Sequence, residues 1–147
     1  MKLTHHVRTS ASPALVWQTL GRPSHWPQFD VFLRSVRGVD GPATQGQHLV
    51  GIARLLSLGI PLDVLEVEPE RRLVLRVRTV PGLSEEVTFV ITPTVRGGSE
   101  IRVSVVLDGP LARPAVLPVW LANGLNARVL AARTHRTARA HRRTAAA

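Results

Sequence analysis

Ser12-Pro13-Ala14-Leu15-Val16-Trp17 and His25-Trp26-Pro27-Gln28-Phe29-Asp30 are the two stretches that decide the fold of this sequence. Ser12 is a good helix N-cap, and Pro13 falls at the first helical position, where its missing N–H costs nothing. We therefore predict a short helix that ends near Gly21, and a second short helix or turn over the second stretch. Both follow a polar segment, residues 3–10, which we predict to be the first strand.

The middle of the chain has the pattern of a sheet. Apolar residues alternate with more polar ones in three consecutive segments, residues 72–78, 87–92 and 101–108. Period-two alternation is typical of antiparallel strands that have one buried face and one wetter face. Less regular apolar segments at 46–56 and 60–68 predict two further strands before them.

From Leu111 the period changes to that of a helix. Leu117, Leu121 and Leu125 recur at every fourth position and form one apolar stripe. Such a stripe predicts a long amphipathic helix whose apolar side packs against the sheet. Because the stripe fades after Ala132, we expect a single domain over residues 1–135 and a basic, frayed or disordered tail over residues 136–147.

Composition excludes several kinds of site. The chain has no cysteine, which rules out disulfides and thiolate metal sites. The histidines and carboxylates do not show the spacing of a metal site, so we expect no metal and no cofactor. The first residues lack the apolar region of a secretory signal, and the longest apolar run is too short to span a bilayer. We therefore expect a cytoplasmic protein without a transmembrane segment.

The positive charge is concentrated at the end of the chain. The formal net charge is +9, and no acidic residue follows Asp108. An Arg-rich end of this kind serves solubility or contacts an acidic partner. We do not expect nucleic acid as a partner, because no aromatic residue after Trp120 is available to stack on a base. The arginines of this region are Arg128, Arg133, Arg136, Arg139, Arg142 and Arg143.

The order strand, two short helices, six strands and long helix resembles the START-like helix-grip fold. The local motifs resemble those of the polyketide cyclase/dehydrase branch of the SRPBCC superfamily, over about residues 3–135. Two positions depart from the family pattern: Ser12 stands where Ala is usual, and Phe29 replaces the second Trp of the Trp-Pro turn. The matching pieces are residues 12–17, Trp26-Pro27-Gln28-Phe29-Asp30, Gly46, Val67-Glu68-Pro69-Glu70-Arg71-Arg72-Leu73 and Gly109-Pro110-Leu111-Ala112.

The resemblance implies an α+β fold in which a curved seven-stranded antiparallel sheet wraps around the long C-terminal helix. It also implies a cavity between sheet and helix, but no catalytic set. Residues that face this cavity either bind a ligand or simply pack the core, since pockets and cores use the same apolar residue types. The ligand-binding residues that we predict are Trp26, Phe29, Phe32, Phe89, Ile91, Val103, Val105, Leu117, Leu121 and Leu125.

Five polar residues are candidates for chemistry in the cavity. His6 and Arg8 share one face of the first strand, where an inward Arg would hold an anionic ring and an inward His would move protons. The same face pointing to solvent is the alternative, and it applies equally to His48 and Arg54. Asp30 is expected to serve the turn rather than act as a base.

Two classes of function fit the sequence. The first is a monomer or homodimer that binds a small hydrophobic or aromatic ligand, polyketide-, lipid- or hormone-like. It acts either as a carrier or as a polyketide cyclase or dehydratase, and the sequence is compatible with both. The alternative is a non-catalytic interaction module with a filled core, whose Arg-rich tail docks an acidic partner.

Overall fold

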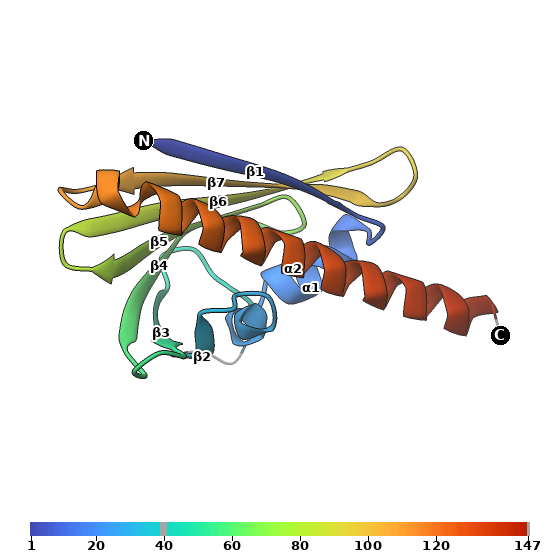
Figure 1. The fold of residues 1–147 in the computed structure, drawn as a ribbon. Helices are drawn as coiled ribbons and strands as arrows, with labels where there is room; N and C mark the ends of the chain where they lie inside the picture. Colours follow the sequence, from blue (N-terminus) through green and yellow to red (C-terminus); the bar gives the residue numbers. More distant parts are fainter. Residues whose placement is uncertain (39–40, 147) are drawn as a thin grey trace.

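One antiparallel sheet and one long helix make up most of the computed structural model, which describes residues 1–38 and 41–146 (Figure 1). The seven strands follow the spatial order β1-β7-β6-β5-β4-β3-β2, so that β1 and β2 are the two edges. Helices α1 and η1 connect the two edge strands, as the sequence predicts. The elements are β1 (Lys2–Thr9), α1 (Pro13–Leu20), η1 (Pro23–Gln28), β2 (Leu33–Arg37), β3 (His48–Ala53), β4 (Gly59–Glu68), β5 (Arg72–Val80), β6 (Leu83–Pro93), β7 (Ser99–Asp108) and α2 (Ala112–Ala146).

Helix α1 begins and ends at the residues that the sequence indicates. The Ser12 hydroxyl accepts a hydrogen bond from Leu15 N at 3.3 Å, and Pro13 occupies the first turn. Gly21 ends the helix with a right-handed backbone, φ −80°, and not with the left-handed one that a C-terminal glycine often supplies. Its role is instead steric, because a Cβ at Gly21 would collide with the indole ring of Trp17.

The sheet is bent, and strand β6 shows which side is inside. Irregularities in the strand register occur at Leu33/Ser35, Val64/Glu66 and Val77/Val80, and bulges of this kind bend and twist a sheet. Along β6 every second residue from Leu83 to Ile91 is buried. The inner face therefore carries an almost wholly apolar row, which faces α2.

Helix α2 meets the sheet with small side chains, which corrects the sequence prediction. Leu117, Leu121 and Leu125 are 64%, 56% and 47% exposed, on the side of α2 away from the sheet. Most of the side chains that α2 buries are small, with Val119 and Leu130 as the larger exceptions, and the three leucines of the stripe are left outside. The buried residues of α2 are Val119, Ala127, Leu130, Ala131, Thr134 and Ala138.

Helix α2 continues to Ala146, where the sequence predicts a frayed or disordered tail. Ala138 is only 6% exposed, and the Arg142 guanidinium donates to Ser10 Oγ at 3.4 Å, so this segment is packed against the rest of the fold in part. Ala147 lies outside the described residues. By length and composition alone α2 is also long and apolar enough to cross a membrane, a property that the core helix of a folded domain shares.

Polar contacts fix α2 along β1. The hydroxyl groups of Thr9 and Thr134 lie 2.9 Å apart in a buried position. Further toward the start of α2, His5 Nε2 lies 3.0 Å from Trp120 O, and the two rings lie at an angle of 39° with their centroids 5.2 Å apart. The odd-numbered face of β1 therefore points inward, and it serves to hold the helix.

Candidate functional site

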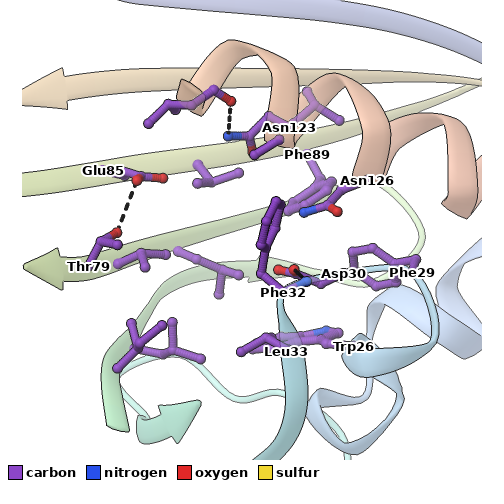
Figure 2. Close-up of a pocket in the computed structure, with 18 of the residues that line it drawn as sticks. Trp26, Phe29, Asp30, Phe32, Leu33, Thr79, Glu85, Phe89, Asn123 and Asn126 are labelled. Carbon is purple, nitrogen blue, oxygen red and sulfur yellow. Dashed lines mark hydrogen bonds between the residues drawn. The ribbon is translucent and has the colours of Figure 1, made fainter. Parts of the chain in front are cut away.

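A cavity of about 310 Å³ lies between the inner face of the sheet and the first half of α2 (Figure 2). Its size is at the lower end of the range found for small-molecule sites. Strands β4 to β7 form the floor, η1 and the start of β2 close one end, and α2 covers the top. The lining residues are Trp26, Phe29, Asp30, Phe32, Leu33, Ile60, Leu62, Leu75, Val77, Thr79, Glu85, Val87, Phe89, Val103, Pro118, Val119, Ala122, Asn123 and Asn126.

Aromatic residues define the end of the cavity near η1. Phe29 and Phe89 meet edge to face, with ring centroids 6.2 Å apart and planes at 78°. The Trp26 indole donates to Leu20 O at 2.8 Å, which joins η1 to the end of α1. Phe32, by contrast, is 53% exposed and stands at the edge of the cavity. This end therefore presents rigid aromatic surface, with one side chain that reaches solvent.

Asp30 is a turn residue that also faces the cavity. Its Oδ1 accepts a hydrogen bond from Phe32 N at 3.0 Å, which is the local turn contact expected for Asp. Asn126 of α2 accepts from Val31 N at 3.1 Å and also hydrogen-bonds the Asp30 carboxyl group. Burial nevertheless dominates and raises the pKa of Asp30 above its ordinary value, although these hydrogen bonds and the charge of Arg54 act in the opposite direction.

Glu85 is a second carboxyl group in the cavity, and it stands in the apolar row of β6. It is only 9% exposed, and its single hydrogen bond among the described residues comes from the Thr79 hydroxyl at 3.0 Å (Figure 2). Burial raises the pKa of Glu85, and the negative charge of Asp30 raises it further. The charge of Asp30 therefore reaches Glu85 across the cavity.

No described residue that lines the cavity is a Lys, Arg or His. The Arg54 guanidinium lies outside the lining, donates to Pro27 O at 3.5 Å and acts on Asp30 only through its charge. Asn123 donates from Nδ2 to Val119 O at 3.0 Å, which leaves its Oδ1 as an acceptor (Figure 2). The polar groups of the cavity are thus two acids, two amides and one hydroxyl, and the acids are the only ones that carry charge.

The structure places half of the predicted ligand-binding residues on the cavity wall, namely Trp26, Phe29, Phe32, Phe89 and Val103. Ile91 and Val105 are buried, with 3% and 0% exposure, but lie in the core beside the cavity rather than on its wall. Leu117, Leu121 and Leu125 are on the outer face of α2 and do not line it.

Three of the five polar candidates point away from the cavity. His6 and Arg8 are exposed on the outer face of β1, where His6 Nδ1 lies 3.2 Å from Glu100 Oε1. His48 is exposed on β3 and contacts Asp63. Of the two alternatives for His6 and Arg8, the structure shows the one in which they point to solvent, because the odd-numbered residues of β1 take the inner face. Of the five, Asp30 alone lines the cavity.

Sequence reasoning missed Glu85, Asn123 and Asn126. The period-two row of Val87, Phe89 and Ile91 points to Glu85 when it is extended toward the start of β6. The two asparagines escape a prediction from hydrophobicity, because the leucine stripe of α2 indicates the opposite face as the inner one. A stripe of small and amide side chains on the opposite side of that helix was the available signal.

The fold and the cavity together define a class of protein, the helix-grip fold with a cavity between the sheet and the terminal helix. The chain belongs to the family described as polyketide cyclase / dehydrase and lipid transport, which matches residues 1–142. None of the curated proteins matches the chain in sequence.

Solved structures share this fold at low sequence identity. Protein MLL2253 from Mesorhizobium loti superposes with a TM-score of 0.76 at 22% identity, covering 93% of this chain and 98% of that one. CalU16 from Micromonospora echinospora gives 0.68 at 15%, over 88% of this chain and 71% of its own. DynU16, a protein of the dynemicin biosynthetic locus, gives 0.69 at 19% and covers 88% of this chain, which spans 45% of DynU16.

Proposed function

We propose that this protein binds a small hydrophobic or aromatic ligand in the cavity between the sheet and α2. The observation that carries the proposal is the cavity itself, about 310 Å³ with walls of aromatic and aliphatic side chains and a few convergent polar groups. The family supports the same class of ligand, since its description joins polyketide cyclases with lipid transport. DynU16 belongs to a biosynthetic locus, which is compatible with a ring-bearing ligand.

A cyclase or dehydratase reaction is the second candidate function, and one observation favours it. Asp30 and Glu85 face the cavity, and burial raises the pKa of both carboxyl groups. A carboxyl group whose pKa moves toward neutrality is suited to proton transfer, the step that ring closure and dehydration both need. In this proposal Glu85, the more buried of the two, acts as the proton donor or acceptor.

The alternative function, an interaction module with a filled core, is less well supported because the structure has an open cavity. The Arg-rich end of α2 remains available for an acidic partner, because its arginines are exposed along the helix. Ligand binding and such a contact use different parts of α2. We propose a cytoplasmic location for either role, in keeping with a chain that has no cysteine.

The proposed function is tested by introducing a large side chain on α2 that fills the cavity. Ala122 lines the cavity, whereas Ala132 is exposed on the same helix, so Ala122→Phe and Ala132→Phe form a matched pair. The uncharged fluorophore N-phenyl-1-naphthylamine reports binding by its enhanced emission. We expect Ala132→Phe to bind the probe like the wild type, and Ala122→Phe to lose at least about tenfold in affinity while circular dichroism confirms its fold.

Equal binding by both variants would contradict the cavity as the binding site. Mass spectrometry of small molecules that copurify with the native protein adds an independent readout. A copurifying small molecule that Ala122→Phe no longer retains would identify the ligand.

A further inference from the structure

The cavity has an unusual charge balance for an apolar site. Two carboxyl groups, Asp30 and Glu85, face it from opposite elements, and no described residue that lines it carries a positive charge. Figure 2 shows both side chains within the same cavity, Asp30 beside Asn126 and Glu85 beside Thr79. Any charge in the cavity is therefore negative.

Both carboxyl groups are held in place by the protein. Asp30 is fixed by Phe32 N and by Asn126, and Glu85 by the Thr79 hydroxyl at 3.0 Å. A carboxylate offers about four acceptor positions. Since Glu85 receives a single hydrogen bond among the described residues, most of its acceptor positions remain for a ligand, and fixed acceptors of this kind need no rearrangement when a donor arrives.

We propose that the cavity selects aromatic ligands that carry a protonated amine and rejects those that carry a carboxylate. This inference rests on the proposed function, since it names the chemistry of the ligand for the same cavity. The rings would lie on Phe29, Phe89 and the aliphatic floor, and the ammonium group would hydrogen-bond Glu85, where it also feels the negative charge of Asp30. Asn123 Oδ1, which lines the cavity from α2, is a further acceptor.

The selectivity follows from the cost of charge in a desolvated site. A carboxylate ligand would add a third negative group beside Asp30 and Glu85, and like charges that share a site disfavour one another. An ammonium ligand neutralises the excess instead and forms charge-assisted hydrogen bonds, the strong class of hydrogen bond. Arg54 offsets part of the charge of Asp30, but it lies outside the lining and leaves Glu85 without a cation.

The test compares three probes with one ring system: 2-naphthylmethylamine, 2-naphthalenemethanol and 2-naphthoate. Isothermal titration calorimetry at pH 7.5 measures each dissociation constant for the wild type. We expect the amine to bind at least about tenfold more tightly than the carboxylate, the scale of one charge-assisted hydrogen bond, with the alcohol in between. As the pH falls and the two carboxyl groups become protonated, the preference for the amine should shrink.

Two variants assign the preference to the carboxyl groups. Glu85→Gln keeps the size of the side chain and the acceptor for Thr79, and it should reduce the ratio between amine and carboxylate to about threefold or less. Asp30→Asn should reduce the same ratio independently. The matched control is Glu86→Gln, the next residue of β6, which lies on the outer face near Arg76 and should leave the ratio unchanged.

The outcomes separate the two levels of the proposal. If the alcohol binds in the cavity but the carboxylate binds as tightly as the amine, the charge selectivity is wrong and the binding function stands. If both Glu85→Gln and Asp30→Asn still prefer the amine over the carboxylate, the charge selectivity is likewise wrong and the binding function stands. If none of the three probes binds, the proposed function fails and this inference fails with it.

Discussion

Replacing Glu85 by Gln should make the unliganded protein more stable at neutral pH. The carboxyl group is 9% exposed, lies in an apolar row and receives one hydrogen bond of 3.0 Å from Thr79. Gln has nearly the same shape and keeps an oxygen for that hydrogen bond. Removing an incompletely satisfied buried charge should raise the free energy of unfolding by about 1–3 kcal/mol, the usual desolvation penalty of such a group.

The effect depends on pH in a direction that the pKa shift fixes. Burial raises the pKa of Glu85 in the folded state above its unfolded value, so the fold prefers the protonated form. Below the ordinary pKa of 4.5 the group is protonated in both states and carries no penalty. As the pH rises from the unfolded pKa to the folded pKa, the unfolded state ionises while the folded state stays protonated, so the free energy of unfolding falls over this window and stays lower above it, whereas Gln does not titrate.

The assay is thermal unfolding at pH 7.5 and at pH 4, followed by circular dichroism without ligand. Each kcal/mol corresponds to about 2–4 °C in Tm for a domain of this size. We expect Glu85→Gln to unfold at a higher temperature than the wild type at pH 7.5 and at a similar temperature at pH 4. Glu86→Gln is the control, because its nearest cation, Arg76, is 3.9 Å away and both side chains are partly exposed; it should change stability by less than about 0.5 kcal/mol.

A Glu85→Gln variant that is less stable than the wild type at pH 7.5 would refute the reasoning. That result would mean that the surroundings of Glu85 favour its ionised form, through polar contacts that outweigh burial. A gain in stability, in contrast, would mark Glu85 as a residue that costs the fold free energy, as groups that serve a ligand often do.

Further predictions concern the packing of α2. Leu130→Ala should lower the free energy of unfolding by about 2–5 kcal/mol because the side chain is fully buried, whereas Leu121→Ala, at an exposed position, should change it by less than about 1 kcal/mol; urea unfolding of the pair checks which face of α2 is inside. Thr134→Val should cost about 1–3 kcal/mol in the same assay, since Thr9 would lose its buried hydroxyl partner. Asn126→Ala should cost about 1–2 kcal/mol and expose the Val31 amide to faster hydrogen exchange; unchanged exchange would show that this amide is protected by something else.

The sequence was sufficient for the fold because independent local signals agree. The Ser12-Pro13 cap fixes the first helix, the period-two rows fix three strands, and the change of period after Leu111 fixes the long helix. The order of these elements then selects the helix-grip arrangement, which the structure confirms. Edge strand β1 was the ambiguous case, since neither of its faces is clearly apolar.

The site was only partly predictable, for two physical reasons. Side-chain size did not identify the inner face of α2, because that face is mostly small, with Ala127, Ala131 and Thr134 beside the single buried leucine Leu130. The leucine stripe therefore pointed outward, and Asn123 and Asn126 were missed with the opposite face. A charged residue in an apolar row is also easily read as the end of that row, although Glu85 continues it into the cavity.

The measurement that tests the central claim most directly is a titration of ¹⁵N-labelled protein with 2-naphthalenemethanol, followed by amide chemical shifts. Binding between sheet and helix predicts the largest shifts at cavity residues on both sides, such as Phe89, Val103 and Asn123, with little change at Leu117 and Leu121. Shifts confined to the exposed leucines of α2, or no shifts at all, would contradict a ligand site inside the fold.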